Sequence, residues 1–457
     1  MRKALLILAV VVLALASFAS ATTPATAQGG EPKYAGLDKD LSGVTIRMAN
    51  IGGGQYENMY KSIAMFEEKT KAKVEIVFLG DGFEIDRKLK TDYATGAVDY
   101  DVAWNHTSFM MQFIDFVEDL KQYFSAEELA QYSKAIIDSA TVDGKLLLIP
   151  RHADISALHY RTDLYDNPDV QAAYEKETGM KLAVPTTLEE VDRQARFFVK
   201  NGYTKFGYGL AGKEEGLTGR FYELLFASGG QFIDDKYEPA FNSEIGVKVA
   251  ELLRSWYKDG IIAQDTPNLI WDGDAANFCN GSVALKLEWY GWYSYFQDPK
   301  NCAVAGKFGL STGFKGFSNE GARRTGWAGA HAFAIPTAAK NKEAAAQLIK
   351  FLTSEAVAYE EAKLGFLPVR DDVWARLIND AAASSVPLDK IRLETARQQI
   401  GEDFKTPPLI AEWIPISNVV FPTLQKIMLG DVSAKEGLDA AAAEARQILA
   451  DAGYYNK

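Results

Sequence analysis

An acidic residue and four aromatic residues occur together at residues 288–293, in the order Glu-Trp-Tyr-Gly-Trp-Tyr. They follow an apolar run at residues 283–287, which predicts a strand. In α/β sheets, ligands bind beyond the carboxyl ends of the strands. An aromatic face complements the C–H face of a sugar ring, and a carboxylate accepts hydrogen bonds from sugar hydroxyls. We therefore expect this cluster to contact a small solute; the alternative is that two or three of its rings are ordinary core residues.

Other predicted strand ends also carry polar side chains. They are residues 52–56 after the first strand, residues 105–107 after Trp104, residues 150–154 between two predicted strands, and residues 324–329 before the apolar run 332–335. Strand ends that meet around one cleft form a binding site. None of these segments contains an evident nucleophile, a set of metal ligands or a phosphate-binding loop.

Motifs for catalysis or metal binding are weak in this chain. Residues 309–313 match G-x-S-x-G, but no helical pattern follows them as a nucleophile elbow requires, so we predict a loop. The triple glycine at 52–54 belongs to neither a P-loop nor a dinucleotide fingerprint. The four histidines lack the spacing of zinc ligands, which favours core or hydrogen-bonding roles. We predict no catalytic residue, no metal and no cofactor.

The elements that must position these side chains follow an α/β pattern. Alternating strand patterns at residues 44–48 and 73–78 flank a helix with Met59, Ile63 and Phe66 on one face. Thr187 to Glu190 has the spacing of a capping box and opens a further helix. This alternation of strands and helices is typical of a mainly parallel sheet covered by helices.

The first 30 residues have the organisation of a secretory signal peptide. Arg2 and Lys3 precede an apolar run at residues 4–16, and Ala-Thr-Ala at 25–27 precedes Gln28. The apolar run is shorter than the about 20 residues of a membrane-spanning helix. We predict cleavage after Ala27, the alternative being an uncleaved anchor.

Size and charge narrow the possible functions. The chain has 457 residues and a net charge of −12, and removal of two basic leader residues would give −14. An acidic exported protein has no electrostatic basis for binding nucleic acid or an anionic membrane. The length favours two domains, and the 47% of hydrophobic residues favours ordered cores.

The chain has two cysteines, Cys279 and Cys302. In an oxidising compartment a disulfide is favoured over two buried free thiols, and it would stabilise the fold by about 3 kcal/mol in the chain-entropy model. Neither cysteine lies near the cleavage site, so we expect no lipid attachment there.

Several segments, taken in order, resemble the family 1 extracellular solute-binding proteins of ABC importers, the maltose-binding-protein-like carbohydrate class. The resemblance covers nearly all of the mature chain. Its segments are residues 44–79, the run Gly-Lys-Leu-Leu-Leu-Ile-Pro at 144–150 with Leu-His-Tyr-Arg-Thr-Asp-Leu-Tyr at 158–165, Phe-Ala-Ile-Pro at 333–336 with the helix that follows, Gly-Phe-Leu-Pro-Val at 365–369, and Leu-Gly-Asp at 429–431.

The resemblance implies a set of ligand-binding positions. They are Gly53, Gly54, Gln55, Tyr56, Asn105, His106, Thr107, Arg151, Asp154, Glu288, Trp289, Trp292, Trp327, Gly329 and Trp413. Maltose-binding relatives have an Asp-Arg pair where this chain has Thr107 and Ser108, which argues against maltose itself. The site is therefore expected to depend more on Arg151, Asp154 and Glu288.

The resemblance also implies the architecture and the role. We expect an α/β protein of two lobes with three interlobe crossings and a ligand cleft between the lobes. The expected segments are a signal peptide at 1–27, a flexible leader at 28–42, one lobe from 43–153 and 328–369, and a second lobe from 154–327 and 370–457. The implied function is a monomeric periplasmic binding protein that captures a sugar, oligosaccharide or polyol and delivers it to the permease subunits of an ABC transporter in the inner membrane.

Two alternatives remain open at this point. One is a secreted glycoside hydrolase that uses two cleft carboxylates as acid and base. The other is a binder of a non-sugar solute on the same fold, such as a metal or a polyamine. The aromatic cluster favours a sugar over a metal or a polyamine.

Overall fold

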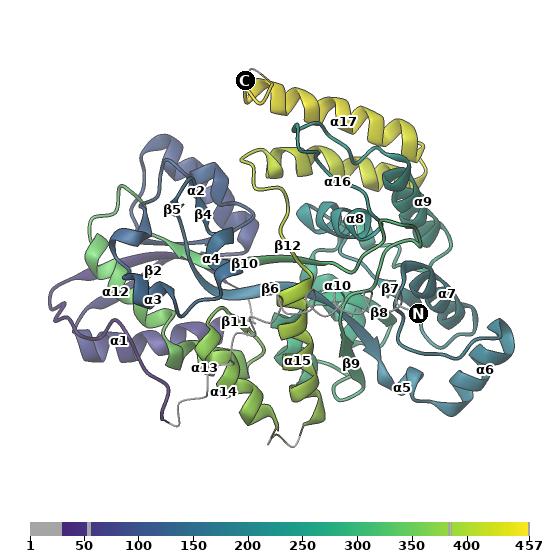
Figure 1. Cartoon of the computed structure of the whole chain (residues 1–457), viewed down its shortest axis with the longest axis horizontal. Coiled ribbons are helices and arrows are strands. Elements are labelled where there is room, and N and C mark those ends of the chain that lie inside the picture. The colour runs from purple at the N-terminus through teal and green to yellow at the C-terminus, as the bar shows by residue number, and fades with distance from the viewer. Residues whose placement is uncertain (1–29, 53–55, 383, 385, 456–457) are drawn as a thin grey trace, which may run out of the picture.

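A central mixed sheet joins two lobes of the chain, as the computed structural model shows (Figure 1). The model describes residues 30–52, 56–382, 384 and 386–455. Over these residues the sheet has ten strands, with the path β2-β1-β3-β10-β6-β8-β7 and with β9, β11 and β12 paired at its sides. The signal peptide predicted at 1–27 lies outside the described residues.

The first lobe contains the parallel strands predicted near the N-terminus. They are β1 (Thr45–Ile51), β2 (Lys73–Gly80) and β3 (Val102–His106), with α1 (Ile63–Thr70) and α2 (Gly82–Thr95) between them. After β3 the chain forms only a short 3-10 helix, η2 (Met110–Phe113), because it soon turns to pair Val117 with Pro336.

Of the strand predicted before residue 150, Lys145–Leu146 form the short strand β5 and only Ile149 belongs to β6 (Ile149–Arg161), which also contains the strand predicted after residue 154. The prediction that residues 150–154 separate two strands was therefore wrong. β10 (Gly326–Ala334) pairs with β6 from Ile149 to Ile155, so its hydrogen bonds carry the strand through the polar residues. Pairing with distant segments overrides the local signals of Pro150 and the charged side chains.

β6 and β10 are the two strands that pass between the lobes. β10 pairs with β3 of the first lobe, and β6 pairs with β8 (Val283–Trp289) of the second. A third passage leaves β11 (Leu367–Pro368), which pairs with β6, and runs through α14 (Asp371–Ala382) and α15 (Pro387–Glu402). It ends at β12 (Phe404–Lys405), which pairs with β10. The segment boundaries at 153, 327 and 369 stay predictions.

Hydroxyl side chains cap three helices of the second lobe, and the one at Thr187 begins where the sequence predicted. Thr187 caps α7 (Leu188–Lys200) by accepting a hydrogen bond from the Glu190 amide, but the Glu190 carboxylate accepts from the Thr186 amide, so the capping box is incomplete. Ser243 and Ser433 cap α9 (Glu244–Lys258) and α17 (Ala434–Asp451) in the same way.

The remaining elements complete the two lobes and the connections between them. They are η1 (Glu57–Ser62), η3 (Leu120–Gln122), α3 (Ala126–Leu129), α4 (Lys134–Ser139), β4 (Thr141–Val142), β5 (Lys145–Leu146), α5 (Thr162–Tyr165), α6 (Pro168–Thr178), β7 (Phe206–Gly209), α8 (Glu215–Ala227), η4 (Thr266–Asn268), α10 (Trp271–Cys279), η5 (Tyr290–Trp292), α11 (Tyr293–Gln297), β9 (Phe308–Ser311), α12 (Lys342–Leu352), α13 (Glu355–Lys363) and α16 (Trp413–Leu429).

Part of the predicted loop at residues 309–313 belongs to β9, which pairs with β6. No helix follows this strand directly, so the segment does not form a nucleophile elbow.

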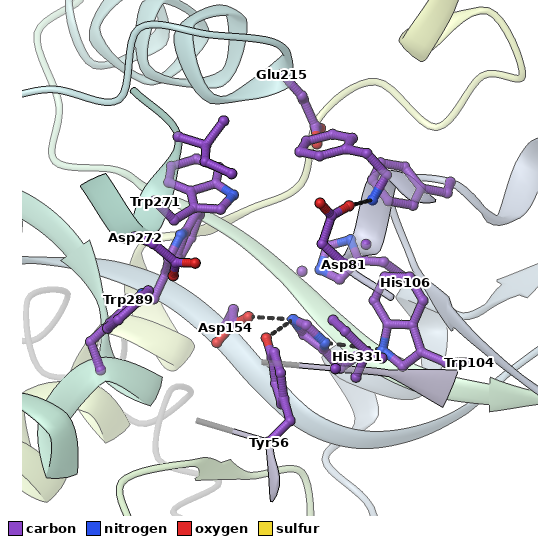
Figure 2. A pocket seen from close by; sticks show the side chains of 18 of the residues that line it. Tyr56, Asp81, Trp104, His106, Asp154, Glu215, Trp271, Asp272, Trp289 and His331 are labelled. Carbon is purple, nitrogen blue, oxygen red and sulfur yellow. Dashed lines mark hydrogen bonds and ion pairs between the residues drawn. The ribbon is translucent and has the colours of Figure 1, made fainter. Parts of the chain in front are cut away.

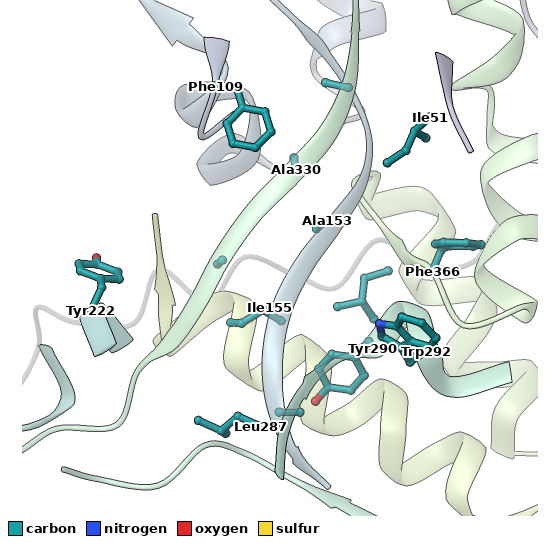
Figure 3. Close-up of a cluster of buried hydrophobic side chains, with 14 of the residues drawn as sticks. Ile51, Phe109, Ala153, Ile155, Tyr222, Leu287, Tyr290, Trp292, Ala330 and Phe366 are labelled. Atoms are coloured by element: carbon teal, nitrogen blue, oxygen red, sulfur yellow. The ribbon is translucent and has the colours of Figure 1, made fainter. Parts of the chain in front are cut away.

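Apolar side chains pack on both crossing strands (Figure 3). Ala153 and Ile155 of β6 and Ala330 of β10 are fully buried, and Leu287 and Tyr290 pack nearby. The cleft region therefore rests on a continuous core. None of the described helices is long and apolar enough to cross a membrane.

The predicted disulfide between Cys279 and Cys302 is present, with a Cα–Cα distance of 4.4 Å. It joins the end of α10 to the loop before β9. Both cysteines are buried, so the bridge lies within the second lobe and not on its surface.

Candidate functional site

A cavity of about 460 Å³ lies between the two lobes and against the crossing strands. The first lobe contributes strand ends and the start of α2, and the second lobe contributes the starts of α8 and α10 and the end of β8. The lining residues are Ile51, Gly52, Tyr56, Asp81, Gly82, Phe83, Trp104, His106, Phe109, Asp154, Glu215, Ile270, Trp271, Asp272, Trp289, Trp292, Tyr295, Trp327, Ala328, Gly329 and His331.

Three tryptophans form the wall of the cavity on the side of the second lobe. The ring centroids of Trp289 and Trp327 are 4.9 Å apart, and the Trp271 ring lies 5.8 and 5.7 Å from them. Gly219 of α8 makes room for this wall, because a Cβ atom there would lie 2.0 Å from the Trp327 ring. The wall offers a broad apolar surface with an electron-rich face to a bound solute.

Arg220 lies behind these tryptophans. Its guanidinium is 4.9 Å from the Trp289 ring centroid and 5.5 Å from that of Trp327. It also forms an ion pair of 2.7 Å with Glu223, and Glu223 accepts a hydrogen bond from the Trp327 amide. The arginine is buried, so it holds the tryptophan wall in place from behind.

Asp154 and His331 join β6 to β10 at the base of the cavity (Figure 2). The Trp104 indole N–H donates to Nδ1 of His331 over 3.1 Å. An indole nitrogen only donates, so the neutral histidine ring carries its proton on Nε2. That nitrogen lies 2.8 Å from Oδ2 of Asp154 and donates to it.

Three of the four histidines gather at this base. The rings of His152 and His331 stack with centroids 4.3 Å apart, and the His106 ring lies 5.1 Å from that of His331. Burial holds the pKa values of His106 and His152 well below the usual range, and the neighbouring His331, when protonated, lowers both further. Gly329 allows this packing, because a Cβ atom there would lie 2.3 Å from the His106 ring.

His106, Asp154 and His331 are the one group of potential metal ligands found in the described part of the chain, with ligand atoms within 4.8 Å of one another. The hydrogen bonds do not fit a metal ion. A metal on Nε2 of His331 would move the ring proton to Nδ1, where Trp104 also donates a proton. The group is therefore better suited to hydrogen bonding with a solute.

Carboxylates make up the charged part of the lining: Asp81, Asp154, Glu215 and Asp272. Glu215 accepts a 2.6 Å hydrogen bond from the Trp413 indole. Burial, with a further contribution from Asp86, raises the pKa of Glu215 to about 7 despite that bond. Burial and then the charge of Asp81 raise the pKa of Asp272.

Seven of the residues predicted to bind ligand lie on the cavity wall. They are Tyr56, His106, Asp154, Trp289, Trp292, Trp327 and Gly329. Their contact with a ligand stays a prediction, as does that of Gly53, Gly54 and Gln55, which lie outside the described residues.

Five predicted residues lie behind the wall, outside the lining. Arg151 and Glu361 form a buried ion pair of 2.5 Å, and Glu288 pairs with the buried Lys286 at 2.6 Å. Asn105 accepts from the His106 amide, Thr107 accepts from the Ala330 amide, and Trp413 is held by Glu215. These residues shape the site from behind in this structure.

Several residues that line the cavity were not among those predicted from the sequence to bind ligand. Asp81 to Phe83 follow β2, so the rule that placed polar groups at strand ends would have found them. His331 shares a face of β10 with the predicted Gly329 because strand residues alternate. Trp271, Asp272 and Glu215 start helices, and no sequence signal points helix starts toward a cleft.

A family model described as bacterial extracellular solute-binding protein matches residues 61–384, well over half of the chain. The chain belongs to this family. As predicted from the resemblance, its relatives are transport binding proteins and not enzymes by name.

Two curated relatives show how this solute-binding protein compares with others. It is 27% identical over 369 residues to a probable amino-acid ABC transporter periplasmic-binding protein of Sinorhizobium fredii, covering 78% of this chain and 79% of that one. It is 21% identical over 433 residues to the mannitol-binding protein of Pseudomonas aeruginosa, covering 90% and 94%.

The solved structure of maltose-bound MalE3 from T. maritima has the same fold as this solute-binding protein. The TM-score is 0.75 at 24% identity, over 89% of this chain and all of that one. The match confirms the predicted two-lobed α/β fold of the binding proteins.

Proposed function

We propose that this protein captures a sugar, oligosaccharide or polyol in the cavity between its lobes and delivers it to the permease subunits of an ABC importer. The observation that carries the proposal is the tryptophan wall of Trp271, Trp289 and Trp327, which shares one cavity with Asp81, Asp154 and Asp272. Rings pack against the C–H face of a carbohydrate, and carboxylates accept hydrogen bonds from its hydroxyls. The mannitol-binding and galactooligosaccharide-binding relatives support this solute class.

An amino acid fits this cavity less well, although one relative is named a probable amino-acid binding protein. An α-carboxylate calls for a cationic partner, usually arginine. No lysine or arginine occurs among the lining residues in the described part of the chain. A bound amino acid would place its carboxylate among other carboxylates.

We also propose that the protein performs no chemistry on its solute. Asp154 is held by His331, and Glu215 is held by Trp413. Membership in a family of binding proteins supports the same conclusion.

The location and the partners complete the proposal. The leader at residues 1–27 directs export, and the absence of a cysteine near Ala27 argues for release into the periplasm without a lipid anchor. There the closed, loaded form of a monomer would dock on the permease. A ligand that contacts both lobes shifts the equilibrium between open and closed forms by its differential affinity for them.

A binding screen tests the proposal. The mature protein is titrated calorimetrically with mannitol, sorbitol, maltose, cellobiose and galactose-containing oligosaccharides, and with L-amino acids for comparison. We expect saturable binding of at least one carbohydrate or polyol without turnover, measured by chromatography of the recovered solute. Binding of amino acids alone, or cleavage of an oligosaccharide, would refute it.

A further inference from the structure

The wall of the cavity carries four carboxylates and no lysine or arginine among the residues described. Asp81, Asp154, Glu215 and Asp272 line the cavity together with His106 and His331, and His331 pairs with Asp154. Neutral carbohydrate sites need hydroxyl partners, and amide or hydroxyl side chains serve for that as well as acids. Four acids without a lysine or arginine create a negative potential that a neutral solute would not offset.

The acids face one another from opposite lobes. Asp81 caps the start of α2 in the first lobe, and Asp272 lies in the first turn of α10 in the second. Figure 2 shows them on opposite sides of the cavity. The repulsion between them contributes to the raised pKa of Asp272, and Asp86 of α2 acts in the same way on Glu215 of α8. Closure of the lobes around a neutral solute would leave this repulsion in place.

Glu215 provides the second observation. Its side chain is 94% buried, since only 6% of the residue is exposed, and it lies on the cavity wall. The Trp413 indole donates to Oε1, and no cation lies within ion-pair distance in the described structure. A buried carboxylate without a cationic partner is costly, and a cation in the cavity would stabilise its charged form.

Two basic side chains of the elements around the cavity, Arg220 and Lys90, are already paired. Arg220 lies behind the tryptophan wall with Glu223, and Lys90 forms a 2.6 Å ion pair with Asp86. Neither side chain lines the cavity. The open faces of Trp271 and Trp289 add a further attraction for a cation within about 6 Å of a ring.

We propose that the solute carries a protonated amine, and that it is an amino sugar or an oligosaccharide containing one. This inference rests on the proposed function and narrows its solute class. The amine lies between the carboxylates of the two lobes, and the sugar ring packs on the tryptophan wall. Because the cation contacts acids of both lobes, it removes the repulsion that opposes closure.

Three disaccharides with one β-1,4-linked skeleton test the charge by itself: the deacetylated glucosamine disaccharide, cellobiose and N,N′-diacetylchitobiose. Each is titrated calorimetrically into the mature protein at pH 6, where the amine is protonated, in low and high salt. We expect the amine-bearing disaccharide to bind at least about tenfold tighter than either neutral one, and to lose affinity in high salt.

A pair of variants tests whether the preference for the amine-bearing disaccharide arises in the cavity. Asp272→Asn removes an exposed carboxylate of the lining, and Asp235→Asn removes an exposed carboxylate of a loop away from it. We expect Asp272→Asn to weaken binding of the amine-bearing disaccharide about three- to tenfold and to weaken binding of cellobiose much less, because asparagine keeps an acceptor for hydroxyls but loses the charge. Asp235→Asn should change neither.

The outcomes separate this inference from the proposed function. Cellobiose or a polyol that binds as tightly as the amine-bearing disaccharide would overturn the inference and leave the proposed function standing. Binding of cadaverine or spermidine with no sugar or polyol of any kind bound would overturn both, since the solute would then be an amine without a sugar. An Asp272→Asn variant with unchanged affinity for the amine-bearing disaccharide would also overturn the inference.

Discussion

Asp154 accepts a 2.8 Å hydrogen bond from Nε2 of His331, and this contact links the two strands that pass between the lobes. The Trp104 indole sets the direction of the bond by donating to the other ring nitrogen. The base of the cavity is therefore held in one arrangement by three side chains from β3, β6 and β10.

Removal of the Asp154 carboxylate should destabilise the protein. Asp154→Ala leaves the His331 N–H without its partner, and we expect a loss of about 1–3 kcal/mol in the free energy of unfolding. Asp154→Asn keeps an acceptor oxygen and should lose less than half as much. Urea denaturation of both variants measures this. Equal losses in the two variants would show that the hydrogen bond to His331 does not matter.

The tryptophan wall should carry much of the affinity for the solute. Trp271→Ala and Trp289→Ala each remove a ring that lines the cavity, and we expect each to weaken binding by about 1–3 kcal/mol. Phe116→Ala removes an exposed ring outside the cavity and should leave affinity unchanged. Calorimetry with the tightest solute from the screen measures all three. If both tryptophan variants bind like the parent, the rings do not stack on the solute.

Glu215 should make stability depend on pH. Its pKa of about 7 in the folded state lies above the 4.5 of an ordinary glutamate, so ionisation costs stability as the pH rises from about 4.5 through 7. Glu215→Gln avoids that cost and keeps an acceptor for Trp413. We expect the variant to exceed the parent by about 3 kcal/mol at pH 8 and to match it at pH 4.5.

Denaturation in urea at the two pH values measures the effect of Glu215. Glu444→Gln, an exposed glutamate of α17, serves as the control and should show no such difference between the two values. An advantage of Glu215→Gln that is the same at both pH values would mean that the buried charge is not the cause.

The histidine cluster should not need a metal. Because Trp104 donates to His331, we expect solute affinity and melting temperature to be the same after dialysis against EDTA and after addition of zinc. Elemental analysis and calorimetry check this. One equivalent of zinc that survives dialysis in the parent, but not in His106→Ala, would contradict it.

The disulfide should stabilise the second lobe. Replacement of Cys279 and Cys302 by serine removes a cross-link over 23 residues, which the chain-entropy model values at about 3 kcal/mol. Urea denaturation of the variant and the parent measures the loss. Intact mass with and without a reductant before alkylation establishes that the parent is oxidised. A stability equal to that of the parent would show that the bridge is dispensable.

Prediction from the sequence worked well where local pattern decides structure. The strand-helix-strand unit from β1 to β2 and the helix start at Thr187 depend on side-chain period and capping, which neighbouring residues determine. The prediction was wrong at residues 150–154. Their local sequence indicates the end of a strand, but pairing with β10 continues β6 through them.

The candidate site shows the same division. Glu288 and Trp289 are neighbours, but successive strand residues point to opposite faces, so Trp289 lines the cavity and Glu288 pairs with Lys286 behind it. Arg151 and Asp154 likewise lie on opposite faces of β6. Asp154 lines the cavity, and Arg151 forms an ion pair with Glu361. The sequence patterns identified the strands that reach the cavity. The alternation of side chains along each strand decided which of its residues line the cavity.

The sequence by itself determined the α/β class, the resemblance to extracellular solute-binding proteins and the cysteine pair, because these depend on pattern, order and spacing along the chain. Only the tertiary structure decided that Asp81, Glu215 and Asp272 share one cavity that no lysine or arginine lines in the described part of the chain. These residues are far apart in the chain, and only the passage of β6 and β10 between the lobes brings them together. The charge of the cavity, and with it the class of solute that we propose, is therefore a property of the folded arrangement.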